Sequence, residues 1–276
     1  MQIGIIAGRG ELPLVIAEDA QARGYRVVVA ALEHLATPDL EKVSDSFRWL
    51  NVGKLASLIE YLQKEGVQDA VMAGKVPKSL MFEGKITPDL RAMKLLFTLK
   101  DRTDDGILNA LADELLREGI RIVDTASFSP NLLMSEGVIT RARPSKDQWK
   151  DIAFGWAIAK EIGGMDIGQT VVVKDKAVMA VEAIEGTDEA ILRGGLYANG
   201  GAVIVKVSKP QQDMRLDVPA IGPATIETMI RAGAGVLALE AGRSIIIQKK
   251  DVVNRADIAG ITIAGITPAV LEGIRS

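Results

Sequence analysis

The chain has 276 residues, of which 48% are hydrophobic and 25% charged, and its formal net charge is −3. This composition predicts a folded protein with a sizeable core and, at this length, two domains. The negative net charge argues against nucleic acid as the main partner, because proteins that bind the phosphate backbone concentrate positive charge. Cysteine is absent and His34 is the single histidine, which excludes disulfides, thiol catalysis and multi-histidine metal centres.

Strands and helices alternate through the first half of the chain. The predicted strands are residues 2–7, 25–32, 69–73 and 120–124, and the predicted helices are residues 11–23, 52–64, 89–100 and 105–118. Such alternation predicts an α/β fold with a parallel sheet, helices on both faces, and ligands at the carboxyl ends of the strands. We therefore expect a Rossmann-like domain over residues 1–130.

The loop after the first predicted strand contains Gly8, Arg9 and Gly10, whose glycines let backbone N–H groups approach a phosphate. This spacing begins like a dinucleotide-binding fingerprint, but Pro13 stands where the third glycine belongs. Glu33 lies near the end of the second predicted strand, where an acid that binds a ribose would lie. An NAD-dependent nucleotide-sugar oxidoreductase or epimerase is therefore one hypothesis.

Two further loops follow the same sheet. Gly74 and Lys75 come after the third predicted strand, either as a ligand-binding loop or as a tight turn with a solvated lysine. Residues 101–106 (DRTDDG) place three acids before a helix. These acids either cap the helix and favour its first turn or belong to a functional site.

Residues 131–146 form a predicted linker, because this region carries prolines, few periodic apolar positions and the basic residues Arg141 and Arg143. Residues 147–276 are expected to form a mixed α/β catalytic domain. Its predicted helices are residues 147–162, 189–193 and 224–232, and its predicted strands are residues 170–174, 177–183, 200–208, 236–239, 244–248 and 261–266. The first two strands, joined by Asp175 and Lys176, form a predicted hairpin.

A polar turn follows that hairpin. Residues 182–188 (EAIEGTD) place three carboxylates and a hydroxyl between a strand and a helix, and Gly186 permits the bend. Thr187 or Asp188 can simply cap the helix. Alternatively, the helix N-terminus binds an anion, and the carboxylates hold a divalent cation that bridges the protein and a phosphate.

Two more polar positions stand out in the second half. Lys206 alternates with Val205 and Val207, which predicts a lysine that faces outward from its strand. Asp217 precedes a Val-Pro pair that keeps the backbone extended. Asp217 is therefore either a local cap or a metal-binding or acid–base group.

Seven motifs, in their order and spacing, resemble the LpxI family, the UDP-2,3-diacylglucosamine pyrophosphatases of lipid A biosynthesis, also called DUF1009 proteins. They are residues 5–13 (IIAGRGELP), 73–75 (AGK), 104–105 (DD), 166–169 (DIGQ), 181–188 (VEAIEGTD), 217–222 (DVPAIG) and 240–243 (EAGR). The resemblance covers nearly the whole chain, and its specificity lies in the ordered set of motifs.

The resemblance implies a cytoplasmic enzyme that works at the inner face of the inner membrane, as a homodimer. Its expected reaction is the Mg²⁺-dependent hydrolysis of UDP-2,3-diacylglucosamine to 2,3-diacylglucosamine 1-phosphate (lipid X) and UMP, with the lipid between the two domains. No apolar run approaches the roughly 18–20 residues that span a bilayer, which predicts a cytoplasmic chain. Peripheral contact with the membrane is what the resemblance implies.

The resemblance also implies roles for particular residues. Asp217 corresponds to the essential aspartate of the family and, with Asp188 and Thr187, is expected to be catalytic. The expected metal ligands are Asp217, Asp188 and Asp104. The expected substrate contacts are Gly8, Arg9, Gly10, Gly74, Lys75, Thr103, Asp104, Gln169, Thr187 and Lys206. A carboxylate-held Mg²⁺ with lysines suits the charge of a pyrophosphate. A non-catalytic nucleotide-lipid-binding protein is the remaining alternative.

Overall fold

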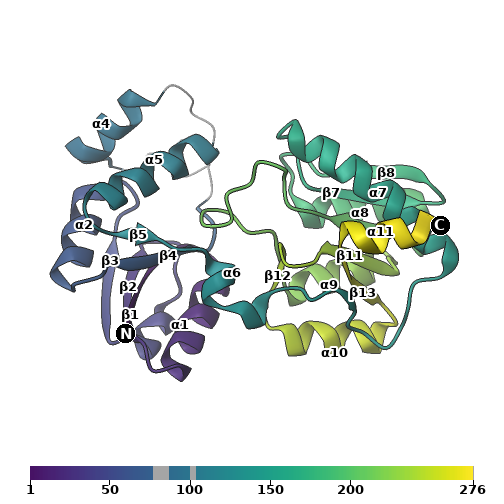
Figure 1. Cartoon of the computed structure of the whole chain (residues 1–276), viewed down its shortest axis with the longest axis horizontal. Coiled ribbons are helices and arrows are strands. Elements are labelled where there is room, and N and C mark those ends of the chain that lie inside the picture. The colour runs from purple at the N-terminus through teal and green to yellow at the C-terminus, as the bar shows by residue number, and fades with distance from the viewer. Residues whose placement is uncertain (77–86, 100–103, 276) are drawn as a thin grey trace. The chain divides into compact units, whose positions relative to one another are not determined.

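The structure, a computed structural model, describes residues 1–76, 87–99 and 104–275 of the chain (Figure 1). It divides into two compact α/β units. Unit 1 consists of Met1–Ser129 and Met214–Leu216, and unit 2 of Pro130–Asp213 and Asp217–Ser276. Residues 131–146, the predicted linker, therefore fall within unit 2.

Unit 1 is built on a parallel sheet with the strand order β3-β2-β1-β4-β5. Its strands are β1 (Gln2–Ala7), β2 (Arg26–Leu32), β3 (Ser46–Leu50), β4 (Asp69–Ala73) and β5 (Arg121–Ile122). The prediction of a parallel sheet is confirmed, and the predicted strands 2–7 and 69–73 have the observed bounds. The edge strand β3 was not predicted.

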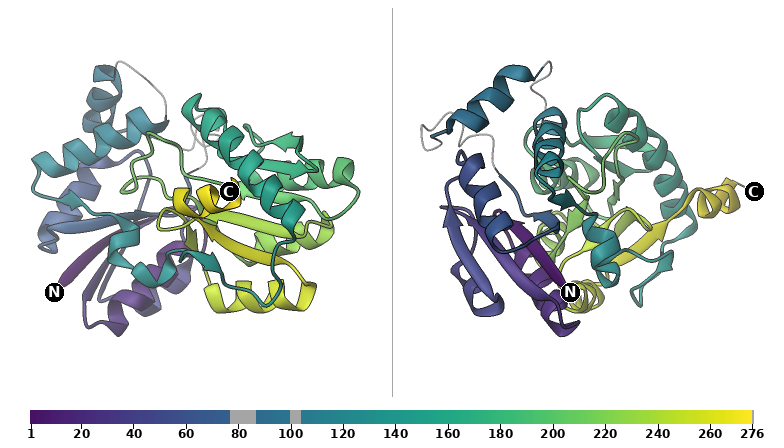
Figure 2. Two further views of the ribbon diagram at one scale, coloured as in Figure 1. Left: turned by 45° about the vertical axis from the view of Figure 1, so that its right-hand side comes forward. Right: turned by 60° about the vertical axis from the view of Figure 1, so that its left-hand side comes forward.

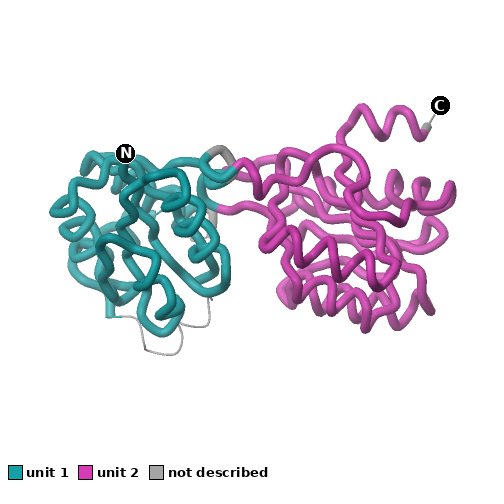
Figure 3. The backbone as a smooth tube through the Cα atoms, turned by 90° about the horizontal axis from the view of Figure 1, so that it is seen from below, with its two compact units in different colours: residues 1–129, 214–216 teal, residues 130–213, 217–276 magenta. Residues whose placement is uncertain are grey.

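Helices cover both faces of this sheet (Figure 2). They are α1 (Leu12–Ala22), α2 (Leu55–Lys64), α4 (Leu90–Thr98), α5 (Asp104–Arg117) and α6 (Thr125–Phe128), with a 3₁₀ helix η1 (Pro38–Val43). Helix α1 contacts β1 and β2. Helices α2 and α5 form an apolar cluster with Val28 and Ala30 of β2. Leu216 also packs on that cluster, which explains why residues 214–216 belong to unit 1 (Figure 3).

Unit 2 contains a mixed sheet with the strand order β6-β13-β11-β9-β7-β8 and a short parallel pair β10-β12. The strands are β6 (Gly137–Val138), β7 (Thr170–Lys174), β8 (Ala177–Val181), β9 (Val203–Lys206), β10 (Ala220–Ile221), β11 (Val236–Glu240), β12 (Ile245–Ile246) and β13 (Thr262–Ile266). Strands β7 and β8 are antiparallel, so the hairpin is confirmed. Strand β6 pairs with β13 inside the segment that was predicted to be a linker.

The sheet of unit 2 lies between two helical layers (Figure 1 and Figure 2). Its helices are η2 (Pro130–Leu132), α7 (Lys146–Gly164), α8 (Thr187–Ala198), α9 (Pro223–Arg231), α10 (Lys249–Ala259) and α11 (Pro268–Arg275). Helices α7 and α11 share one apolar cluster with the sheet, and α8, α9 and α10 share the other. The short predicted helix 189–193 is thus the longer α8, and α10 and α11 were not predicted.

Strand direction brings several chain segments to one edge of this sheet. Strands β9 and β11 are parallel, and β7 runs antiparallel to both β9 and β8. The carboxyl ends of β8, β9 and β11 therefore lie at the same edge as the amino end of β7. The register pairs Lys206 with Thr170 on one side and with Leu239 on the other. Residues that follow β8 and precede β7 consequently meet around Lys206.

Candidate functional site

A chain of hydrogen bonds joins three side chains at this sheet edge. The Lys206 ammonium donates from Nζ to Thr187 Oγ1 at 2.7 Å, and Thr187 Oγ1 donates to Glu182 Oε1 at 2.7 Å. The backbone N–H of Gln169 donates to the other oxygen of Glu182 at 3.3 Å. Thr187 is the first residue of α8, so this set of contacts, which we call the lysine relay, links β9, the β8–α8 turn and that helix.

Both charged ends of the lysine relay are buried, because Lys206 is 4% exposed and Glu182 is 8% exposed. Burial raises the pKa of the Glu182 carboxyl, but the positive charge of Lys206 and the hydrogen bonds from Thr187 and Gln169 outweigh burial. The pKa of Glu182 therefore lies below its ordinary value of 4.5, and the carboxylate is ionised at neutral pH. The relay thus holds a buried positive charge against a buried negative charge.

Residues beside the relay have buried side-chain oxygens that accept no hydrogen bond. Gln169 Oε1 and Asp188 Oδ1 are buried and have no hydrogen-bond partner among the residues that the structure describes. Buried polar atoms are nearly always paired in native proteins, so unpaired ones point to a missing partner such as a ligand, an ion or water. Gly186, at φ 85°, is the N-cap of α8 and gives it no side-chain cap. Neither Thr187 nor Asp188 is that cap.

A second polar cluster lies farther along the same edge. Glu240, the last residue of β11, is 8% exposed, and its Oε2 accepts hydrogen bonds from Lys160 Nζ at 2.6 Å and from the backbone N–H and hydroxyl of Ser208. Arg243 Nε donates to Ser208 Oγ at 2.6 Å. This cluster fixes the chain two residues beyond Lys206.

Asp217 has a different environment from the lysine relay. Its side chain is exposed and accepts a hydrogen bond from Gln212 Nε2 at 2.6 Å, and its backbone N–H donates to Asp213. Gln212 is buried and in turn accepts from the Lys209 backbone N–H. Within the described part of the chain, no hydrogen bond or ion pair connects Asp217 with Thr187 or Asp188. The structure brings Thr187, Lys206 and Gln169 together but leaves Asp217 in a separate set of contacts.

In unit 1 the two glycine loops contact each other. Gly8 N–H donates to Ala73, and Arg9 and Lys75 exchange backbone hydrogen bonds, each at 2.9 Å. A Cβ at Gly74 would lie 2.8 Å from the Arg9 carbonyl oxygen, and one at Gly8 would lie 2.9 Å from the Lys75 carbonyl oxygen. The close approach of the loops therefore explains Gly8 and Gly74, and the N–H groups of Gly8 and Arg9 are used within unit 1.

The remaining predicted site residues show few contacts that bear on a site. Glu33 accepts a hydrogen bond from Asn51 Nδ2 at 3.3 Å, beside the end of β2. Thr103 and the side chain of Asp104 lie outside the described residues, although Asp104 begins α5. Over residues 1–76, 87–99 and 104–275, no three or more His, Asp or Glu side chains are grouped as a ready metal site.

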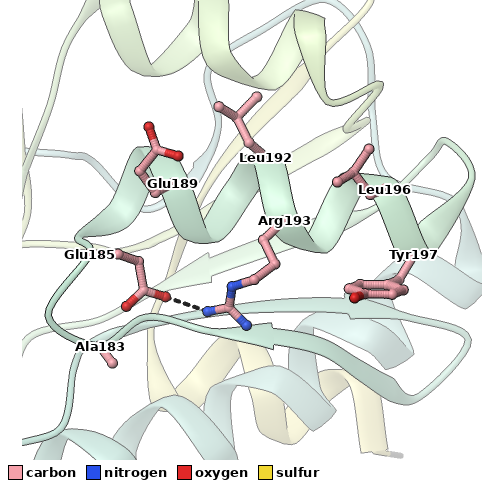
Figure 4. A pocket seen from close by; sticks show the side chains of 7 residues that line it. All are labelled: Ala183, Glu185, Glu189, Leu192, Arg193, Leu196 and Tyr197. Carbon is pink, nitrogen blue, oxygen red and sulfur yellow. Dashed lines mark hydrogen bonds and ion pairs between the residues drawn. The ribbon is translucent and has the colours of Figure 1, made fainter.

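A cavity of about 810 Å³ lies along the outer side of α8 (Figure 4). Figure 4 shows Arg193 reaching towards Glu185, with which it forms an ion pair, and Tyr197 beside it. The described residues that line the cavity are Ala183, Glu185, Glu189, Leu192, Arg193, Leu196 and Tyr197. Among them, only Glu185 was considered from the sequence, as one of the three carboxylates of the turn at residues 182–188.

Sequence reasoning did not single out Glu182 beyond counting it among the three carboxylates of its turn. Its burial depends on the segment at Gly168, which packs so closely that a Cβ there would collide with the Glu182 carbonyl oxygen. The Glu240–Ser208–Lys160 cluster was also missed as a unit. Ser208 and Lys160 are 32 and 80 residues from Glu240 in the chain, and the pairing of β9 with β11 and the packing of α7 on the sheet bring them together.

These features define a two-unit α/β protein whose second unit carries buried lysine–carboxylate clusters at one sheet edge. The protein-family model of the LpxI N-terminal domain matches residues 2–132, and that of the LpxI C-terminal domain matches residues 135–264. The chain therefore belongs to the LpxI family, and the resemblance seen in its motifs is confirmed.

Individual relatives agree with this assignment. The UDP-2,3-diacylglucosamine pyrophosphatase LpxI of Caulobacter vibrioides is 32% identical over 97% of this chain and 98% of its own length. The bifunctional purine biosynthesis protein PurH of Anaeromyxobacter sp. is 26% identical over 45% of this chain and 21% of its own length. The solved structure of CobK precorrin-6A reductase aligns over 100% of this chain and 94% of its own at 15% identity. Its TM-score of 0.31 is too low to bear on the fold.

The structure also bears on membrane insertion. Among the residues it describes, no helix is both long and apolar enough to cross a bilayer.

Proposed function

We propose that the chain hydrolyses the pyrophosphate of UDP-2,3-diacylglucosamine to 2,3-diacylglucosamine 1-phosphate (lipid X) and UMP. The observation that carries the proposal is the relative named UDP-2,3-diacylglucosamine pyrophosphatase, which matches at 32% identity over 97% of the chain. Water would attack the phosphorus on the sugar side. The bond from that phosphorus to the bridging oxygen would break, and UMP would leave with the bridging oxygen.

The lysine relay supports this chemistry. Phosphoryl transfer needs positive charge placed where negative charge accumulates, and preorganised charges in a buried site supply it most effectively. Lys206 is a buried cation next to the N-terminus of the twelve-residue helix α8, whose N–H groups favour an anion. We propose that the phosphates bind there, with Gln169 and Thr187 beside them.

Mg²⁺ is proposed as the cofactor. The unpartnered oxygens Asp188 Oδ1 and Gln169 Oε1 are of the kind that Mg²⁺ accepts. Mg²⁺ usually takes one or two carboxylates together with substrate phosphates. Asp188 and Asp217, with Asp104 as a further candidate, would hold the ion, and the bound ion would neutralise charge on the phosphate oxygens. Asp217 would also orient the attacking water.

The strand order β3-β2-β1-β4-β5 supports a Rossmann-like assignment of unit 1, because it is that of the first five strands of the doubly wound fold. A nicotinamide cofactor gains no support from this order. Pro13 replaces the third glycine, and the Gly8 and Arg9 N–H groups already bond within unit 1.

Peripheral contact with the inner membrane and a homodimer stay proposals. Sedimentation with lipid vesicles and light scattering would test them, and a monomer that leaves vesicles unbound would contradict both.

The test is an assay of UMP release from UDP-2,3-diacylglucosamine by the purified full chain. We expect turnover with Mg²⁺, loss of turnover in excess chelator, and no turnover by Asp217→Ala although substrate still binds. Asp147→Ala is the matched control, because Asp147 is exposed and pairs only locally with Lys150. Saturable substrate binding without UMP release would show a binding protein instead. Full activity in chelator would remove the metal from the mechanism.

A further inference from the structure

Glu182 has no assigned part in the reaction, yet it is the negative end of the lysine relay. Its carboxylate is buried and contacts the Thr187 hydroxyl and the Gln169 N–H. An ammonium without a partner is costly to bury, so Lys206 at 4% exposure needs a nearby negative charge. Glu182 places a negative charge close to Lys206 and is linked to it through Thr187.

The chemistry of the three groups sets the direction of the relay. A carboxylate only accepts hydrogen bonds, an ammonium only donates them, and a hydroxyl has one hydrogen and two lone pairs. The Thr187 hydrogen therefore points to Glu182, and a lone pair of Thr187 Oγ1 faces Lys206. Because its hydrogen is committed to Glu182, the Thr187 hydroxyl does not offer it to a phosphate while the relay is intact. Lys206 is the member of the relay that brings positive charge to the substrate.

We infer that Glu182 is a positioning residue for pyrophosphate cleavage: acting through Thr187, it holds the Lys206 ammonium at the N-terminus of α8, where the substrate phosphate binds. This inference rests on the proposed function and deepens it. The lowered pKa of Glu182 agrees with it, since the relay requires an ionised carboxylate. The backbone contact from Gln169 and the close packing at Gly168 keep Glu182 itself in place.

The relay makes a specific kinetic prediction. A charge that is held ready stabilises the transition state more than the bound substrate, so its displacement lowers kcat and leaves KM nearly unchanged. We expect Glu182→Gln and Thr187→Val each to lower kcat by roughly 10- to 100-fold, with KM within about 3-fold of the wild type. Thr187→Ser keeps the hydroxyl and should stay within about 3-fold of the wild type in both constants.

The double variant Glu182→Gln/Thr187→Val separates this role from a merely structural one. If Glu182 acts through Thr187, the loss in the double variant falls well short of the product of the two single losses. Glu161→Gln is the control, since Glu161 is exposed on α7, which covers the opposite face of the sheet from α8. Its kinetics should equal those of the wild type.

UMP release by the wild type is measured first, and thermal unfolding is followed for every variant. A wild type without turnover would overturn the proposed function and this inference together. An active wild type whose kcat survives Glu182→Gln and Thr187→Val, or whose losses multiply independently, would overturn the inference alone. If Glu182→Gln does not fold, the Thr187→Val and Thr187→Ser pair decides: equal kcat in the two overturns the relay, and a loss confined to valine supports it.

Discussion

The Lys206 charge and the hydrogen bonds to Glu182 favour its ionised form, so its protonation is coupled to the stability of the fold. Its pKa is lower in the folded chain than its ordinary value of 4.5. Below that ordinary value the unfolded chain binds the proton more readily than the folded chain. The stability that Glu182 contributes is therefore fully present above about pH 4.5 and is lost as the pH falls through the folded pKa.

We expect acid to reduce the free energy of unfolding less steeply in Glu182→Gln than in the wild type. The amide cannot take up a proton in this range, so its part of the pH dependence disappears. Urea unfolding at pH 7, 5, 4 and 3 measures the difference. Parallel pH profiles for the two proteins would show that Glu182 titrates alike in the folded and unfolded states.

Lys206 shows what strand alternation can predict and what it cannot. Alternation correctly places Lys206 on the opposite side of β9 from Val205 and Val207, which face α7. It also led to the expectation of an outward-facing lysine, which is wrong, because α8 covers that face and Lys206 is 4% exposed. Whether a second layer covers a strand depends on distant segments and not on the strand itself.

At the scale of elements, the loops after β1 and β4 pack on each other through backbone atoms. Gly74 combines φ 88° with a position where a Cβ would lie 2.8 Å from the Arg9 carbonyl oxygen. Gly24 has a similar φ of 77°, but a Cβ there would meet nothing within 4 Å. Comparing substitutions at Gly74 and Gly24 therefore separates the effect of backbone strain from the effect of loop contact.

We expect Gly74→Ala to lower the free energy of unfolding by about 2–3 kcal/mol and Gly24→Ala by about 1 kcal/mol. Both alanines carry the strain of a positive φ, and only the first also collides with a neighbouring loop. Urea denaturation of the two variants gives the comparison. Equal losses would mean that the loops separate at little cost and that Gly74 serves the backbone angle alone.

The predicted elements that match the structure are those with a strong apolar pattern, such as β1, β4 and β7. Strand β3 escaped prediction because it is an edge strand in which only Leu50 is buried, so no apolar alternation marks it. Helix α10 was missed for a similar reason, since Val252 and Ala256 are its only buried residues. The positions of the site residues relative to one another could not be predicted, because they depend on sheet register.

At the scale of the whole molecule, each unit has apolar clusters of its own, and the tryptophans report on them separately. Trp49 lies in unit 1, and Trp149 and Trp156 lie in unit 2. Units with independent cores often unfold in separate transitions. Leu216 is part of unit 1 although residues on either side of 214–216 belong to unit 2.

We expect Leu216→Ala to destabilise unit 1 by about 1 kcal/mol, less than a fully buried leucine would, because Leu216 is half-buried. The unfolding transition that Trp49 fluorescence reports should move to a lower urea concentration. In a Trp49→Phe background, the transition of unit 2 should not change. Leu196→Ala, at an 84% exposed position, is the control. A shift of the unit 2 transition alone would contradict the placement of Leu216.

The three-residue excursion at 214–216 limits how the chain can be divided. A cut after Ser129 would leave the N-terminal piece without Leu216 and would expose that leucine on the C-terminal piece. Transplanting either half into another protein would thus require moving or replacing these three residues. The halves match separate family models, yet they are not freely interchangeable modules.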